Sequence, residues 1–325
     1  MATGIVSNAL FLQGPRRLSD LMFVANAAAY VWLAGLTIVR AARFPGVVWS
    51  DLLNPRLVFA FFSFVAATDV LGEGGYLRGF TTTALYLWLL ALFVWVVLIY
   101  VGFAVLTFLN TTRTADVIHG GWLLAVVGTE SLVVLGAAVA PMTKGIGPTA
   151  ILLIHMLWGL GLTLYAIYMA QFTYRLFYFD IAPDEMTPVL WVVMGAAAIS
   201  TNAGSSLIVT GTSLHFLNAL VPFVDGITLI VWTWATFWAP LLLLIAIWKY
   251  VVRRVPPTYT TMLWSAVFPL GMYSVATLRL SRAGDFAALR PIAEVMLWIA
   301  VAGWVAALVG LVVASWRSYR TFAAS

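Results

Sequence analysis

The sequence predicts an all-α membrane protein that crosses the bilayer many times. Of the 325 residues, 63% are hydrophobic and only 9% are charged, whereas a soluble domain carries about 25% charged residues. The apolar residues also gather in successive segments close to the length of about 20 residues that a transmembrane helix needs. No stretch has the composition of a soluble domain, so we expect one transmembrane domain over residues 1–325.

The composition excludes several classes of protein. The absence of cysteine rules out disulfides and thiolate metal sites, and the three histidines lie too far apart to suggest a metal site. No phosphate-binding glycine loop or nucleophile elbow is present. We therefore expect neither an enzyme nor a cofactor. The net charge of +5 indicates cytoplasmic loops rather than a surface that binds nucleic acid.

Ten apolar segments follow one another along the chain. They cover residues 1–13, 21–39, 57–71, 81–108, 121–140, 148–172, 189–209, 220–250, 259–278 and 291–315. The first is too short to span a bilayer, and no basic region precedes it as in a signal peptide. Two interpretations remain open: a re-entrant half-helix, or the second half of a span whose first half is missing.

The segments alternate in character along the chain. Those with odd numbers carry small and polar residues, whereas those with even numbers are longer and richer in Leu, Val and Trp. Small and hydroxylated residues let helices approach closely or face a polar interior. We therefore predict five helical hairpins, with an inner ring of odd helices around a polar interior and an outer ring of even helices. The candidate residues facing this interior are Thr3, Gly4, Ser7, Gly128, Thr129, Glu130, Gly195 and Ser200.

The ninth segment carries an unusual trio, Phe268, Pro269 and Gly271, near its middle. Proline removes a backbone donor and clashes with the carbonyl one turn earlier. In lipid, the freed carbonyl needs another partner or a water-filled cavity. The segment therefore predicts a broken or kinked helix with an aromatic ring at the kink. It faces either a pore or simply other protein.

Two carboxylates fall within odd segments. Glu130 lies in the middle of the fifth segment, where a charge costs at least about 2.5–3.5 kcal/mol, so it should face the interior. It either couples transport to a proton or forms a structural hydrogen bond between helices. Asp69, near the end of the third segment, is interpreted as an interfacial cap. No basic residue falls clearly within an odd segment.

The distribution of lysine and arginine predicts the orientation. With both termini in the cytoplasm, ten of these residues lie on the cytoplasmic side and seven on the other. The clusters at 40–56 and 249–254 agree with that orientation. We expect a multi-pass protein of the plasma membrane with both termini inside.

Three motifs resemble one known family over nearly the whole chain. They are Met-Ala-Thr-Gly-Ile-Val-Ser at 1–7, Pro188-x-x-Trp-x-x-Met-Gly195, and Trp264-x-x-x-Phe268-Pro269-x-x-x-Tyr273. Together with the ten-span layout, they are similar to the tellurite-resistance/dicarboxylate transporter family, within the voltage-dependent anion channel superfamily. Its members include plant guard-cell slow anion channels, yeast malate permeases and fungal sulfite pumps.

The resemblance implies a homotrimer in which each subunit has its own central pore lined by the odd helices, so that the residues facing the polar interior become the candidate pore lining. It also favours a truncated first helix, because the family's first-helix motif normally lies within a longer span. In that family a phenylalanine of the ninth helix plugs the pore, and Phe268 matches its position. The implied function is anion transport across the bilayer, with small inorganic anions or dicarboxylates as substrates. Since the odd segments lack a clear basic residue, we expect helix dipoles and hydroxyls to hold the anion. A proton-coupled carrier of C4-dicarboxylates such as malate, or an exporter of sulfite or tellurite, is the alternative.

Overall fold

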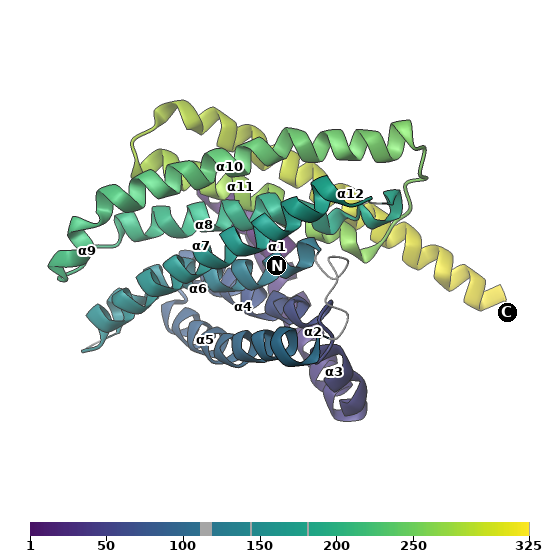
Figure 1. The fold of residues 1–325 in the computed structure, drawn as a ribbon, viewed down its shortest axis with the longest axis horizontal. Helices are drawn as coiled ribbons and strands as arrows, with labels where there is room; N and C mark the ends of the chain where they lie inside the picture. Colours follow the sequence, from purple (N-terminus) through teal and green to yellow (C-terminus); the bar gives the residue numbers. More distant parts are fainter. Residues whose placement is uncertain (111–118, 144, 181, 325) are drawn as a thin grey trace.

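The protein is all-helical in its computed structural model, which describes residues 1–110, 119–143, 145–180 and 182–324. Every regular element within these ranges is a helix (Figure 1). The predicted all-α class is therefore confirmed. Arg113 and Lys144, which entered the predicted orientation, lie outside the described residues.

Nine helices of the described ranges are long and apolar enough to cross a membrane, which confirms the polytopic architecture. They cover Arg16–Arg43, Val58–Leu77, Thr81–Leu109, Gly120–Met142, Gly147–Tyr178, Pro188–Val209, Val221–Val252, Thr261–Ala283 and Ala287–Arg320. The first apolar segment forms a helix of only 12 residues. That helix measures about 18 Å, against about 30 Å of hydrocarbon.

Burial divides the helices into two sets, as the alternation of residue types predicts. The long inner helices bury 61–89% of their most apolar window, and the outer helices bury only 11–44%. The inner set comprises α1 (Ala2–Gln13), α4 (Phe62–Leu77), α6 (Leu124–Val139), α8 (Val192–Val209) and α11 (Trp264–Ala283). The outer set comprises α2 (Arg16–Arg43), α5 (Thr81–Ala104), α7 (Gly147–Tyr178), α10 (Val221–Ile247) and α12 (Arg290–Ala324).

The outer helices enclose the inner ones in space. Figure 1 shows α5 along the lower part of the molecule and α10 with the first part of α12 along the upper edge, with α4, α6 and α8 between them. Two short helices, α3 (Pro45–Leu52) and α9 (His215–Ala219), lie in connections between spans. The inner helices α4, α6, α8 and α11 each follow a short 3-10 turn, over Val58–Phe61, Gly120–Leu123, Pro188–Trp191 and Thr261–Leu263.

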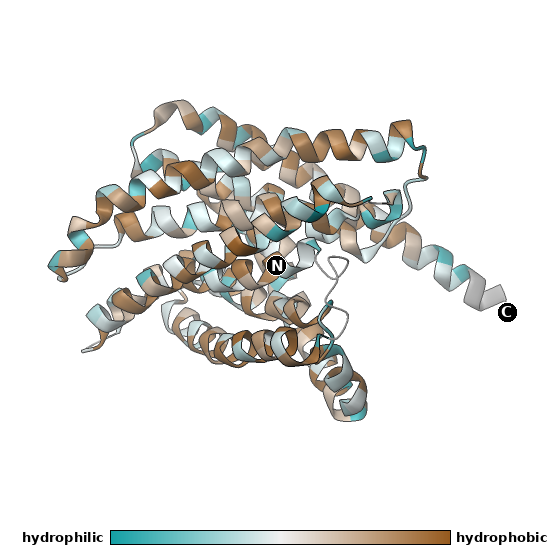
Figure 2. Ribbon diagram, in the orientation of Figure 1, coloured by the Kyte–Doolittle hydropathy of each residue, from teal (hydrophilic) through white to brown (hydrophobic). Residues whose placement is uncertain are grey.

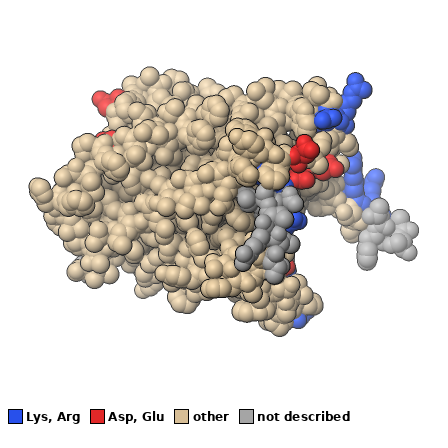
Figure 3. All heavy atoms as spheres, viewed as in Figure 1, with Lys and Arg blue, Asp and Glu red and all other residues tan. Residues whose placement is uncertain are grey.

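The surface of the outer helices suits a lipid environment. Apolar residues cover much of their length (Figure 2), and large side chains such as Trp32 and Phe93 are more than two-thirds exposed. On the face drawn in Figure 3, charged residues lie at the two ends of the molecule, with a broad uncharged band between them. Exposed apolar area of this kind is stable only against lipid or another protein.

Two of the differences from the predicted segment boundaries bring charged residues into inner helices. The third span continues to Leu77 instead of ending near residue 71, because Gly72 and Gly74 let it pack closely against Leu135 and Asn8. The ninth span continues to Ala283 and includes Arg279. The helix α11 also runs through Pro269 without interruption, so of the two forms predicted for this segment, broken or kinked, the broken form is not observed.

Candidate functional site

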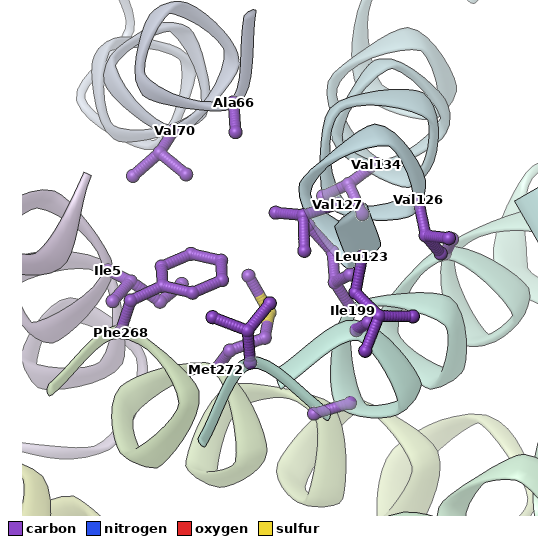
Figure 4. Packing of buried hydrophobic residues seen from close by; sticks show 14 of the residues in the cluster. Ile5, Ala66, Val70, Leu123, Val126, Val127, Val134, Ile199, Phe268 and Met272 are labelled. Atoms are coloured by element: carbon purple, nitrogen blue, oxygen red, sulfur yellow. The ribbon is translucent and has the colours of Figure 1, made fainter. Parts of the chain in front are cut away.

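Phe268 lies at the centre of the inner helices. Its side chain is only 1% exposed. Figure 4 shows its ring beside Ile5 of α1 and facing Ala66 and Val70 of α4. Met272 follows one turn later on α11, and aliphatic residues of α6 and α8 complete the cluster. Side chains of α1, α4 and α11 therefore lie next to this aromatic ring, and all five inner helices contribute to the apolar cluster that contains it.

Glycines allow the inner helices to come close enough to surround Phe268. A Cβ added to Gly195 of α8 would lie 2.8 Å from Cγ of Pro269, and one added to Gly271 would lie 2.9 Å from Ile5. A Cβ added to Gly4 of α1 would lie 2.8 Å from Val70. Such distances are too short for any real side chain. These three glycines therefore serve close helix contacts, which accounts for their positions in the sequence.

The hydroxyl groups expected to line the pore are bonded to neighbouring elements. The hydroxyl of Thr3 accepts a hydrogen bond from Trp304 Nε1 of α12 at 3.1 Å. Ser7 Oγ donates to the carbonyl of Ser19 in α2 at 2.8 Å. Thr129 Oγ1 accepts a hydrogen bond from Trp95 Nε1 of α5, also at 2.8 Å. Each of these three hydroxyls connects an inner helix to an outer one.

Glu130 is completely buried in α6, as its position in the sequence predicts. Its carboxylate packs against α7, where a Cβ added to Gly161 would lie 2.4 Å from Oε1. The nearby hydroxyl of Ser200 in α8 donates to the carbonyl of Ala196. Gly128, two residues before Glu130, packs closely against Phe62. The carboxylate thus lies where α6, α7 and α8 meet.

Asp69 is a second buried carboxylate, and its surroundings contradict the interfacial cap predicted from the sequence. It is 1% exposed and accepts a hydrogen bond from Ser131 Oγ of α6 at 2.7 Å. The prediction was wrong because it ended the third span too early. Asp69 lies well inside α4, where its carboxylate joins two inner helices.

A polar network missed in the sequence analysis connects four inner helices. Arg279 of α11 forms an ion pair with Glu73 of α4. Its Nη1 donates to Asn202 Oδ1 at 3.1 Å and to Ser206 Oγ at 3.2 Å, both in α8. Asn8 Nδ2 of α1 donates to the other carboxylate oxygen of Glu73 at 3.2 Å. The prediction that inner helices lack a clear basic residue is therefore wrong.

The network borders a cavity of about 290 Å³ near the C-terminal ends of α4, α6, α8 and α11. We call this cavity the vestibule. Its lining consists of Glu73, Tyr76, Leu77, Val134, Ala137, Ala138, Ser205, Ser206, Val209, Thr210, Arg279 and Arg282. The sequence held one indication that Arg279 belongs to the interior: it follows Phe268 by eleven residues. Eleven residues make about three turns, so both side chains share one face of α11.

Comparison with known proteins agrees with this architecture. A family model described as a voltage-dependent anion channel matches residues 1–312. An uncharacterized membrane protein of Mycobacterium tuberculosis is 37% identical over 137 residues, which cover 42% of this chain and 69% of the relative. An uncharacterized transporter of Methanocaldococcus jannaschii is 24% identical over 195 residues, covering 60% of this chain and 55% of the relative. Since the family match covers nearly the whole chain, this protein belongs to the voltage-dependent anion channel family.

Proposed function

We propose that the protein conducts small anions across the plasma membrane through a pore between α1, α4, α6, α8 and α11, and that Phe268 closes this pore. Membership of the voltage-dependent anion channel family supports anion transport as the general function. The observation that carries the finer proposal is the position of Phe268, buried within the apolar cluster to which all five inner helices contribute.

An apolar ring can close such a pore without a charged gate. Hydrophobic constrictions exclude ions because water, and the ions that it hydrates, leave a narrow apolar passage. Phe268 is surrounded by aliphatic side chains such as Ile5, Val70 and Met272. Removal of the ring leaves space within this cluster, on the same face of α11 as the vestibule. We expect water and anions to pass through this space.

The test is the anion current through purified protein in a planar bilayer, with Phe268→Ala compared with the unmodified protein. We expect a large current in Phe268→Ala and little in the unmodified protein. Phe59→Ala is the matched control, because Phe59 is equally buried but its ring packs against the rings of Trp122 and Tyr168. Equal currents in all three proteins would contradict the gate.

A second function, a proton-coupled carrier for a C4-dicarboxylate, is favoured by the buried carboxylate of Glu130. A carboxyl group inside the membrane is a recurrent element of proton relays. In a carrier of this kind, Glu130→Gln abolishes proton-driven malate uptake into vesicles. In a channel, the same variant retains its anion current. An exporter of sulfite or tellurite is tested with the same vesicles and those anions.

The assembly that we propose is a homotrimer with both termini of each subunit in the cytoplasm. The exposed apolar side chains of the outer helices support contacts with lipid and with other subunits. In this orientation the vestibule opens on the outer side of the membrane, because the inner helices end there. Mass measurement of the detergent-solubilised protein tests the trimer, and labelling of single cysteines introduced near each end of the chain tests the orientation.

A further inference from the structure

We propose that Arg279 is an anion-binding residue at the base of the vestibule, and that Glu73 occupies its guanidinium group until an anion replaces the carboxylate. This inference rests on the proposed anion pore. The ligands are small anions: oxyanions with up to four oxygen atoms, such as nitrate or carboxylates, and single halides such as chloride. The ion pair of Arg279 and Glu73 then acts as an electrostatic gate that is distinct from the aromatic ring of Phe268.

The two charges differ in their access to the vestibule. The side chain of Arg279 is 21% exposed, whereas that of Glu73 is 5% exposed. Both residues line the cavity of about 290 Å³, and one water molecule takes up about 30 Å³ of liquid volume. The cavity therefore has room for a small anion and several waters beside the guanidinium group.

The guanidinium group is held in place independently of Glu73. Its Nη1 donates to Asn202 and Ser206, while its Nη2 binds the carboxylate of Glu73. Loss of the carboxylate therefore leaves the group anchored to α8. Arginine binds carboxylates and other oxyanions through parallel N–H donors in a fixed fork. The site consequently keeps its geometry when one anion exchanges for another.

Glu73 also has another partner when it leaves the guanidinium group. Its second oxygen accepts a hydrogen bond from Asn8 Nδ2 of α1 at 3.2 Å. Only one of the contacts of the carboxylate is therefore with Arg279. Exchange of the arginine contact for an anion breaks the ion pair without leaving Glu73 entirely unpaired, because Asn8 remains bonded to it.

The site lies between the outer mouth and the aromatic plug. Arg279 follows Phe268 by eleven residues of α11, which corresponds to about 16 Å along the helix axis. Asn202 connects the two regions, because its Nδ2 contacts Sδ of Met272 at 3.6 Å, and Met272 lies near the ring of Phe268 (Figure 4). An anion held at Arg279 therefore lies on the outer side of the plug, about three turns of α11 away from it.

Binding is measured with the purified full-length protein in detergent, without any need for conduction. The thermal unfolding midpoint is followed while sodium nitrate replaces sodium gluconate at constant ionic strength. Removal of the competing charge in Glu73→Gln should lower the half-saturating nitrate concentration by about tenfold or more, since hydrogen bonds to charged groups change equilibria by one to two orders of magnitude. If the half-saturating nitrate concentration is the same in Glu73→Gln as in the unmodified protein, the proposal is overturned.

Variants of the two vestibule arginines give the matched comparison. Arg282 lines the same cavity but is exposed and has no ion pair with Glu73. We expect Arg282→Gln to keep the nitrate response and the double variant Glu73→Gln/Arg279→Gln to lose it. The double variant leaves no unpaired buried charge, so it avoids the folding defect expected of Arg279→Gln alone. A saturable nitrate response in the double variant, or its loss in Arg282→Gln, would contradict the site.

Bilayer currents separate this proposal from the proposed pore. In a Phe268→Ala background, Glu73→Gln should lower the nitrate concentration that gives half-maximal current, by the same factor as in the binding measurement. A current in Phe268→Ala that Glu73→Gln leaves unaltered upholds the plug and overturns the anion site. A nitrate response that follows Glu73 and Arg279, without current in any variant, upholds the site and overturns the pore.

Discussion

Gly195 of α8 lies directly against the pyrrolidine ring of Pro269 in α11, so close that an added Cβ would come within 2.8 Å of Cγ. The two helices share the most extensive contact between any two described helices. Pro269 follows Phe268 in the chain, and this contact therefore fixes the part of α11 that carries the central aromatic ring. The glycine is required by the close approach and not by its backbone angles, because it lies within a regular helix.

Substitution of Gly195 by alanine should destabilise the protein and displace the central part of α11. Additional atoms in a well-packed core cost about 1–3 kcal/mol, and the ring of Pro269 cannot rotate away. The measurement is the thermal unfolding midpoint of the purified protein in detergent. Gly159→Ala is the control, because a Cβ at that exposed position of α7 meets nothing within 4 Å. Equal midpoints for the two variants would refute the close contact.

Glu130 and Gly161 should behave as a coupled pair. Gly161→Ala places a methyl group where Oε1 of Glu130 lies, 2.4 Å from the ideal Cβ, so it should lower the unfolding midpoint. In a Glu130→Ala background the same change should cost much less. Contacting residues typically show coupling energies of about 0.5–3 kcal/mol. The four proteins of this cycle are compared by chemical or thermal unfolding, and additive effects would show that the contact does not exist.

The hydrogen bond between Trp95 and Thr129 should be important for stability. Thr129→Val leaves the buried indole N–H of Trp95 without its acceptor, which costs about 1–3 kcal/mol. Thr129→Ser retains the hydroxyl and should stay close to the original stability. Thr233→Val provides the comparison, because the hydroxyl of Thr233 is exposed and bonds only within α10. If Thr129→Val and Thr129→Ser unfold at the same temperature, the indole contact is not significant.

The imidazole of His119 should make stability depend on pH. Burial lowers the pKa of His119 from its usual 6.5, although a hydrogen bond to the carbonyl of Arg56 partly opposes this effect. Its Nδ1 accepts the N–H of Gly121 at the start of the 3-10 turn before α6, and this bond requires a neutral ring. Because the pKa is lower in the folded state, the stabilisation is present above pH 6.5 and is lost as the pH falls below it.

The measurement is the unfolding midpoint across the range from about pH 8 to pH 5, where histidine changes its charge. His119→Asn keeps a side-chain acceptor at the cap but cannot titrate in this range. Its midpoint should therefore fall less than that of the unmodified protein on acidification. Parallel pH curves for the two proteins would assign the pH dependence to other groups.

Sequence alone was sufficient for the architecture. Low charge and segment length predicted a polytopic all-α protein, and the alternation of small, polar residues with bulky ones predicted inner and outer helices. Both predictions rest on properties of single segments. Backbone groups in lipid must be hydrogen-bonded within their own helix, and small or polar residues mark the helices that pack in the interior. The resemblance of the motifs around Phe268 and Gly195 also indicated the family that the comparison confirms.

Roles of individual polar residues were decided only by the tertiary structure. Hydropathy ended the third span before Glu73 and the ninth before Arg279, because each charge alone resembles the end of a helix. The structure places both inside the helix bundle, where each charge compensates the other across 206 positions of sequence. Likewise, a threonine or serine in an inner helix has the same appearance in sequence whether it faces a pore or a tryptophan of an outer helix. The sequence determines where charge and polarity occur along each helix, but pairing depends on the rotation and approach of distant helices, which only the folded chain establishes.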